Sequence, residues 1–200
     1  MPISPLRRYR AAAPLLVVVA LVTASCGADD GADGANGGGA AQPSVQTPTA
    51  GLPPRLASNL KQGDQIIGEG KDVFDRRLRE LRGHPVVVNQ WASWCPSCRF
   101  EFPFFAAAVK RYRAEVGFLG LDSQDETGPA EDFLREHPVG FPSISDPSAE
   151  VAAAYGGGQA WPTTIFFDSE GEVANVKIGA YATAELLDED IRRYALGGGG

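Results

Sequence analysis

Two cysteines separated by two residues are the residues of this chain best suited to chemistry. Cys95 and Cys98 follow an apolar run, Pro85 to Trp91, and precede an aromatic-rich segment, Phe100 to Tyr112. This pattern predicts a buried strand followed by a helix that begins at the cysteine pair. The helix N-terminus would stabilise a thiolate at Cys95, and Cys98, one turn further on, would attack once a mixed disulfide has formed. The spacing therefore predicts a redox-active dithiol.

Two other interpretations of the pair are weaker. A zinc site needs more ligands, but the chain has no second Cys-x-x-Cys pair, and its two histidines, His84 and His137, are isolated in sequence. A purely structural disulfide is disfavoured because closing so short a loop removes little entropy from the unfolded chain. We therefore prefer the redox interpretation.

Length, charge and cysteine content narrow the class of protein. The 200 residues suit one domain with appendages, and three cysteines are too few for a disulfide-stabilised secreted scaffold. The net charge is −7, and the first 26 residues contain three arginines and no acidic residue, so the remainder carries −10. An acidic domain of this kind is not expected to bind nucleic acid.

Residues 1–26 are predicted to be a secretory signal. A basic segment, Arg7 to Arg10, precedes an apolar segment, Ala11 to Val22, which is too short for a comfortable transmembrane helix. An uncleaved anchor is the alternative. The last four residues, Thr23-Ala24-Ser25-Cys26, resemble the bacterial lipobox, in which the cysteine is lipidated and becomes the mature N-terminus. Cys26 is therefore the predicted lipidation site.

The rest of the chain divides by composition. Residues 27–54 contain almost no large apolar side chain and are predicted to be a disordered tether. Residues 55–196 form the predicted folded domain, and residues 197–200 a flexible tail. One or two short edge strands are expected between Leu56 and Ile67. The other strands and helices are expected, in chain order, as helix 72–81, strand 85–91, a helix after Cys98, strand 116–121, helix 129–137, extended segment 141–145, helix 148–155, hairpin strands 163–168 and 172–178, and helix 183–196.

This order of elements, together with several motifs, resembles the thioredoxin fold and, within it, the TlpA/ResA/CcmG group of bacterial thiol:disulfide oxidoreductases. The matching stretches are VVVNQWASWCPSCRFEFP at 86–103, AAY at 153–155, AWPTTIFFD at 160–168, Gly171 and Gly179. The resemblance implies an α/β fold with a central mixed β-sheet flanked by helices. It also implies a TlpA-type insertion between the second core strand and the following helix, within residues 121–148.

The resemblance assigns roles to particular residues. Cys95 corresponds to the attacking thiol and Cys98 to the resolving thiol, while Pro162 stands where the family has a cis-proline beside the disulfide. An ordinary trans turn is the alternative for Pro162. Glu101 occupies the position of the family's buried acid, and its aromatic neighbours favour burial over a solvated helix position. Asn89 stands where thioredoxin has a buried aspartate, which leaves Glu101 as the candidate proton acceptor for Cys98.

A polypeptide-binding rim is predicted around the cysteines. Trp94 and Trp161 are expected to form its apolar part, unless they are plain core residues. The complete set of predicted substrate-binding residues is Trp94, Pro96, Ser97, Trp161 and Thr163.

The function implied by the resemblance is that of an extracytoplasmic, lipid-anchored thiol:disulfide oxidoreductase that needs no cofactor or metal. Its implied substrates are exported proteins with cysteines, such as apocytochrome c, and its implied electron donor is a membrane thiol reductase. We predict reduction of substrates, because no basic residue lies between the cysteines to depress the thiol pKa. The alternatives are a disulfide-forming oxidase and a copper or haem-pathway chaperone, although copper chaperones of this fold carry a Cys-x-x-x-Cys spacing.

Overall fold

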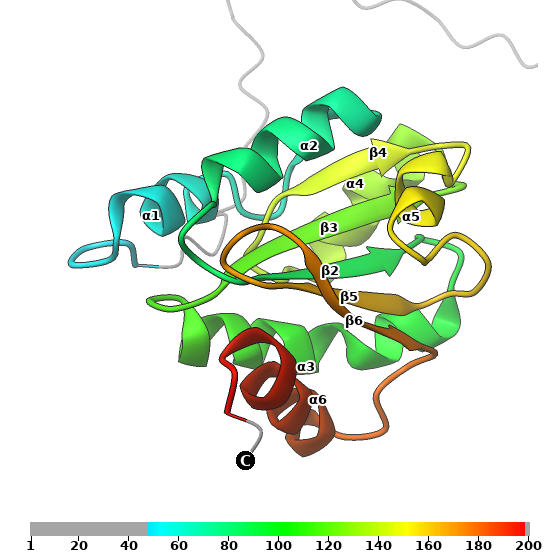
Figure 1. Ribbon diagram of the computed structural model, residues 1–200. Helices are drawn as coiled ribbons and strands as arrows, with labels where there is room; N and C mark the ends of the chain where they lie inside the picture. Colours follow the sequence, from blue (N-terminus) through cyan, green and yellow to red (C-terminus); the bar gives the residue numbers. More distant parts are fainter. Residues whose placement is uncertain (1–47, 199–200) are drawn as a thin grey trace, which may run out of the picture. The chain divides into compact units, whose positions relative to one another are not determined.

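The computed structural model describes residues 48–198, in which six strands form one sheet with helices on both faces (Figure 1). The strands are β1 Ile66–Glu69, β2 Val86–Trp91, β3 Gly117–Ser123, β4 Ser143–Asp146, β5 Thr163–Phe167 and β6 Val173–Ile178. The helices are α1 Pro54–Leu60, α2 Lys71–Glu80, α3 Pro96–Tyr112, α4 Thr127–Glu136, α5 Glu150–Ala154 and α6 Ala184–Asp190, followed by a π-helical segment, Ile191–Ala195. The predicted signal, Cys26 and residues 27–47 of the predicted tether lie outside the described residues.

The sheet is mixed, with strand order β1-β4-β3-β2-β5-β6. The strands β1, β4, β3 and β2 run parallel, while β5 is antiparallel to β2 and β6 is antiparallel to β5. This arrangement confirms the predicted α/β fold with a central mixed sheet flanked by helices. Between β3 and α5 the chain forms α4 and β4, and the assignment of this segment as a TlpA-type insertion stays a prediction.

Successive side chains of β2 point to opposite faces of the sheet, and the core therefore has two layers. Every residue of β2 is buried, with Val87 and Trp91 in the layer beneath α3, α4 and α6, and Val86 and Val88 in the layer beneath α2 and α5. Both layers are made mainly of aliphatic and aromatic side chains, whose removal from water is the main favourable contribution to folding. The cysteine pair belongs to the first layer, so the α3 side of the sheet carries the candidate chemistry.

Gly120 on β3 makes room for the packing of Trp91. The indole of Trp91 stacks on Phe133, with ring centroids 5.2 Å apart, and its Nε1 donates to Ser143 Oγ at 3.1 Å. A Cβ atom at position 120 would lie 2.1 Å from Ser143 Oγ and 2.8 Å from Trp91 Nε1. Only glycine fits there without displacing one of the two side chains, so this site beneath the redox centre is closely packed.

The prediction of edge strands between Leu56 and Ile67 is wrong in its first half. Residues 54–60 form α1, and only β1 is a strand. Pro54 is tolerated in the first turn of a helix, and Leu56, Asn59 and Leu60 lie on one buried face. Asn59 Nδ2 also donates to the Phe118 carbonyl at 2.8 Å, which fixes α1 to the start of β3.

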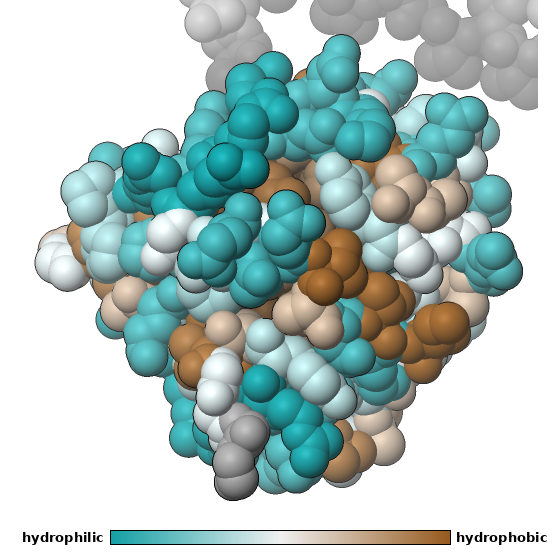
Figure 2. Space-filling model, in the orientation of Figure 1, coloured by the Kyte–Doolittle hydropathy of each residue, from teal (hydrophilic) through white to brown (hydrophobic). Residues whose placement is uncertain are grey.

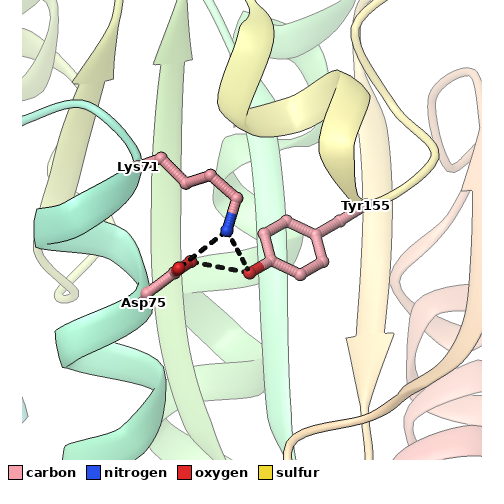
Figure 3. A network of polar contacts seen from close by, with 3 residues as sticks. All are labelled: Lys71, Asp75 and Tyr155. Atoms are coloured by element: carbon pink, nitrogen blue, oxygen red, sulfur yellow. Dashed lines mark hydrogen bonds and ion pairs between the residues drawn. The ribbon is translucent and has the colours of Figure 1, made fainter.

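A polar network connects α2 to the end of α5 (Figure 3). Lys71 Nζ lies 2.6 Å from Asp75 Oδ2 and 3.2 Å from the Tyr155 hydroxyl, which itself donates to Asp75 Oδ1 at 2.6 Å. Burial alone would raise the pKa of Asp75, but the hydrogen bonds from Lys71 and Tyr155 together outweigh it and lower the pKa. The Tyr155 ring packs against Phe74 and Phe167, so this network has a structural role on the face of the sheet opposite α3.

The surface seen in Figure 2 is largely hydrophilic, with apolar side chains gathered near β5 and β6 of Figure 1. Val173 and Ile178 on β6 are both exposed. None of the helices among residues 48–198 combines the length and apolar character needed to cross a membrane.

Candidate redox site

The cysteine pair lies where the sequence predicts it, between the end of β2 and the start of α3. Cys95 is the N-cap residue of α3 and forms a disulfide with Cys98 in the first turn, with their Cα atoms 5.3 Å apart. The Cys98 backbone N–H also points at Cys95 Sγ, at 3.1 Å. Both residues are buried, with Cys95 at 2% and Cys98 at 0% exposure. A thiolate at Cys95 would therefore meet the free N–H groups of the helix N-terminus.

The loop before β5 contacts the turn between the two cysteines through Ser97. The peptide bond between Trp161 and Pro162 is cis, as predicted. Ser97 Oγ lies 3.5 Å from Cys95 Sγ and 3.4 Å from the Trp161 carbonyl, so it bridges α3 and this loop. Thr163 is buried at the start of β5, and its hydroxyl donates to the Ala160 carbonyl at 2.9 Å. Thr163 therefore stabilises the loop through a buried hydrogen bond. Its side chain is not exposed to a partner, in contrast to its prediction as a substrate-binding residue.

Trp94 and Trp161 form an aromatic pair beside the disulfide. Their ring centroids are 5.5 Å apart, and Trp94 is 53% exposed whereas Trp161 is half-buried. The Trp94 indole donates to the Gln124 carbonyl at 2.8 Å, and the Trp161 indole donates to the Ser123 carbonyl at 3.1 Å. Both indoles are therefore fixed to the end of β3. Trp94 is not a plain core residue, and it offers an apolar surface next to Cys95.

A shallow, open depression of about 750 Å³ adjoins Trp94. Its lining combines polar and proline residues from the ends of β2, β3 and β4: Ser93, Trp94, Gln124, Asp125, Glu126, Pro129 and Pro147. Pro96 and Ser97 are exposed at the start of α3. The exposed surface around the cysteines is thus broad and open rather than a deep pocket for a small molecule.

Glu101 is completely buried one turn after Cys98 on α3, at 0% exposure. Asn89 Nδ2 donates to Glu101 Oε1 at 2.8 Å, and the Tyr181 backbone N–H donates to Glu101 Oε2 at 2.9 Å. The solvated alternative for Glu101 therefore does not apply. Sequence reasoning treated Asn89 only as a missing aspartate and did not anticipate its hydrogen bond to Glu101 or the contribution of Tyr181, 80 residues away.

Burial raises the pKa of Glu101 to about 7, against the opposing influence of the hydrogen bonds from Tyr181 and Asn89 and of the charge of Lys177. A carboxyl group with this pKa exchanges its proton near neutral pH, which suits a general acid or base. Its position one turn from Cys98 makes that thiol the candidate proton donor.

Two further acidic residues next to the site were missed from the sequence. Asp122 is buried on β3, and Asp125, in the segment between β3 and α4, accepts hydrogen bonds from the backbone and the hydroxyl of Ser93. The only sequence feature that could have suggested them is their place at the carboxyl end of a central strand, where side chains approach the residues that follow β2. Within residues 48–198, no group of three or more potential metal ligands is arranged to hold a metal ion.

A dithiol at the N-terminus of the helix after a central strand, facing a cis-proline loop, defines the thioredoxin-fold class of thiol:disulfide oxidoreductases. Similarity to known proteins gives the same result. The chain belongs to the AhpC/TSA family, whose model matches residues 62–176.

Sequence similarity to individual proteins indicates which group within the family this chain resembles. The chain is 29% identical to the thiol-disulfide oxidoreductase ResA of Bacillus subtilis over 137 residues, which are 63% of this chain and 76% of the relative. It is 31% identical to ResA of Oceanobacillus iheyensis over 148 residues, or 66% of this chain and 76% of the relative. These similarities confirm the predicted ResA-like group and the predicted thiol:disulfide oxidoreductase activity.

Solved structures agree with the fold and the activity. A thiol:disulfide interchange protein DsbE from Chlorobium tepidum superposes with a TM-score of 0.54 and 28% identity, covering 59% of this chain and 84% of that one. A DsbF homologue from Corynebacterium diphtheriae gives a TM-score of 0.54 and 29% identity, covering 58% of this chain and 75% of that one.

Proposed function

We propose that this oxidoreductase reduces disulfides in exported polypeptides through the Cys95 and Cys98 dithiol. The observation that carries this proposal is the position of Cys95 as the N-cap of α3, with Cys98 buried behind it. Insulin reduction by the reduced protein, followed as precipitation of the insulin B chain, is the direct test. No turnover under conditions in which thioredoxin is active would refute the proposal.

The reaction balances without a cofactor. The Cys95 thiolate attacks one sulfur of the substrate disulfide, forms a mixed disulfide and releases the first substrate sulfur as a thiolate. Cys98 then loses its proton, with Glu101 as the proposed acceptor, and attacks Cys95 Sγ. The substrate leaves as a dithiol, and the protein is left with the Cys95–Cys98 disulfide. Two electrons have passed to the substrate, so a thiol donor must reduce the protein again.

Local charges support reduction as the direction of electron flow. Pro96 and Ser97 separate the cysteines, so no basic side chain lies between them. The nearest cation along α3, Arg99, is exposed, and its guanidinium lies over the Phe133 ring at 5.4 Å. Glu101, the buried acid on the same helix, does not favour a second negative charge. Only the helix N-terminus and the Ser97 hydroxyl then stabilise the Cys95 thiolate, as in a reducing member of this class.

The midpoint potential of the Cys95–Cys98 couple is therefore expected to lie below about −180 mV, the value of protein disulfide isomerase. Equilibrating the protein with glutathione and dithiothreitol redox buffers, and counting free thiols by alkylation and gel shift, measures it. A more positive potential would contradict the reductase proposal and favour the disulfide-forming oxidase.

The exposed Trp94 and the open surface beside it support a polypeptide as substrate. Trp94, Pro96 and Ser97 are exposed around Cys95, and Trp161 is half-buried beside them. An apolar rim of this kind suits an extended segment around a cysteine better than a small thiol. Exported proteins such as apocytochrome c, and a membrane thiol reductase as donor, remain the proposed partners from the family resemblance.

The proposed location is the outer side of the cytoplasmic membrane, with lipid on Cys26 and the stretch from residue 27 up to α1, which begins at Pro54, as the tether. The lipobox-like sequence ending at Cys26 and the polar stretch that follows support this proposal. Because lipoprotein modification adds more than one acyl chain, it satisfies the requirement for stable anchoring.

Replacing Cys26 with serine is expected to move the protein from the membrane fraction to the soluble fraction, because the lipid acceptor is lost. Immunoblots of fractionated cells expressing each form measure the distribution. A Ser25→Ala variant, which keeps the small residue before the cysteine, is the matched control and should stay with the membrane. Wild-type protein in the soluble fraction would contradict lipidation.

A further inference from the structure

An open pocket lined by arginines lies between α1 and the second half of α2. Its volume is about 550 Å³, within the range of pockets that hold small ligands. Its charged lining residues are Arg55, Arg76, Arg77, Arg79 and Glu80, and we call it the arginine pocket. Figure 2 shows strongly hydrophilic side chains gathered over α1 and α2, in the orientation of Figure 1.

Positive charge is concentrated in the arginine pocket. Its four arginines and one carboxylate give a formal charge of +3, although the chain as a whole carries −7. The carboxylate, on Glu80, pairs with Arg77, with Oε2 2.7 Å from Nη1. Among residues 48–198, no carboxylate forms an ion pair with Arg55, Arg76 or Arg79. Most of the positive charge of the pocket is therefore not neutralised by the protein.

Capping of α2 does not account for all four arginines. An arginine near the end of a helix can donate to its free carbonyl groups, and Arg55 does so just beyond α2, where its Nη1 donates to the Arg82 carbonyl at 2.8 Å. Arg77 is different, because its Nε and Nη2 atoms are buried and find no hydrogen-bond acceptor within residues 48–198. Burial of charged N–H groups without an acceptor is costly, so the guanidinium of Arg77 calls for an anionic partner.

We propose that the arginine pocket binds a phosphate group, carried by an anionic phospholipid head group or by a soluble phosphate ester. Guanidinium groups are planar and permanently charged, and their paired N–H donors match the spacing of phosphate oxygens. A phosphate beside Arg77 would supply the acceptor that its buried N–H groups lack, and Ser58 brings a hydroxyl to the same lining. Exposed negative charges elsewhere on the protein are screened beyond about 8 Å at physiological ionic strength, so the local positive charge governs the attraction.

The arginine pocket and the redox site lie at opposite ends of β2. The segment after α2 leads into Val86, the first residue of β2, and Asn59 of α1 donates to the start of β3. Cys95 instead follows the last residue of β2, and the length of this strand is roughly 17 Å. A phosphate bound in the arginine pocket therefore leaves the cysteine pair uncovered.

The position of α1 bears on the source of the phosphate. Pro54, which lines the arginine pocket, begins α1 at the point where the proposed tether ends. A head group bound there would hold the domain with its cysteine pair facing away from the membrane and toward exported substrates. This orientation rests on the proposed lipid anchor, whereas the phosphate site itself depends neither on the anchor nor on the proposed function.

Isothermal titration calorimetry with soluble probes tests the proposal on the full chain carrying Cys26→Ser, which has no lipid acceptor. The probes are inorganic phosphate, glycerol 1-phosphate, dihexanoyl phosphatidylglycerol and dihexanoyl phosphatidylcholine, with both lipids kept below the concentration at which they form micelles. We expect saturable binding of the anionic probes and much weaker binding of the zwitterionic phosphatidylcholine.

The double variant Arg76→Gln/Arg79→Gln is expected to weaken that binding about 100-fold, or about tenfold for each charged donor removed. Both arginines are exposed, so the fold and the rate of insulin reduction should be retained. Arg135→Gln/Arg193→Gln is the matched control, since it removes two exposed arginines outside the pocket and changes the net charge equally. The control should bind the probes as tightly as the unaltered pocket.

The probes also separate the two sources of phosphate. Binding of phosphatidylglycerol alone supports a head group, binding of the small phosphates alone supports a soluble ester, and binding of all three shows that the phosphate group suffices. No saturable binding of any anionic probe, binding of hexaglutamate alone, equal affinity for phosphatidylcholine, or equal losses in the pocket and control variants would each overturn the phosphate site. Insulin reduction is measured separately, so a failure of the proposed function is distinguishable from a failure of this site.

Discussion

Replacing Cys98 with serine is expected to leave the protein covalently attached to its substrate. Cys95 keeps its place at the N-terminus of α3 and still attacks, but no second sulfur follows to release the mixed disulfide. Turnover of insulin should fall by on the order of 1,000-fold or more, because an external thiol cannot match the effective concentration of a sulfur fixed in the next turn. Non-reducing gels of the variant incubated with insulin would show the mixed disulfide as a new band.

Two variants make this experiment interpretable. Cys95→Ser should lose both turnover and the covalent band, because the attacking thiol is gone and Cys98 has no exposed surface. Ser97→Ala keeps both sulfurs but loses a hydroxyl that stabilises the Cys95 thiolate, so it should turn insulin over more slowly and still not accumulate the band. A Cys98→Ser variant that turned over normally would contradict the assignment of Cys98 as the resolving thiol.

Glu101→Gln is expected to slow the resolution of the mixed disulfide by Cys98. Glu101 has a pKa of about 7 because burial outweighs its two hydrogen bonds, so the wild type can accept the Cys98 proton near neutral pH. A glutamine cannot, and resolution of a preformed mixed disulfide at pH 7.5 should slow by on the order of 100-fold. The wild-type inflection near pH 7 should also disappear from the rate profile between pH 5 and 9. Rapid mixing of the isolated mixed disulfide, sampled by acid quench, measures the step.

Glu101→Gln is also expected to change how the free energy of unfolding depends on pH, and the raised pKa of Glu101 determines the direction of that change. The folded-state pKa of Glu101 lies above its ordinary value of 4.5, so the folded protein binds more protons than the unfolded chain between pH 4.5 and 7. Wild-type stability should therefore fall by about 3 kcal/mol as pH rises through that window, and Glu101→Gln should lack this contribution. Urea unfolding of the oxidised protein at pH 4.5 and 8 compares them. Glu115 is exposed, so the control variant Glu115→Gln should lose as much stability between pH 4.5 and 8 as the wild type. If Glu101→Gln lost as much stability as the wild type, the raised pKa of Glu101, and with it the proposed proton transfer, would be contradicted.

The elements around the cysteines could be predicted because local pattern and tertiary context agree there. The apolar run of β2 is buried along its whole length, and the aromatic residues of α3 indicated that Glu101 would be buried with them. The cysteine pair, set between this apolar run and the aromatic segment that follows, predicted a helix N-terminus at Cys95. Where each local preference supports the same structure, a single sequence is enough to place the element.

The residues that were missed depend on contacts that no local pattern contains. α1 begins with Pro54 and is short, so its few apolar positions fit a strand as well as a helix until Asn59 meets the Phe118 carbonyl. Glu101 receives a backbone N–H from Tyr181, and any residue type could have supplied that group. Asp122 and Asp125 read in sequence as ordinary polar residues after a strand, and only the depth of Asp122 distinguishes them.

The close approach of Gly120, Trp91 and Ser143 constrains how this sequence can diverge. The space that a side chain at position 120 would need is filled by the indole of Trp91 and the hydroxyl of Ser143, although the three residues come from three different strands. An alanine at 120 is compatible only with the loss of bulk at one of the other two positions. A replacement at any one of the three positions is therefore expected to need a compensating change at another.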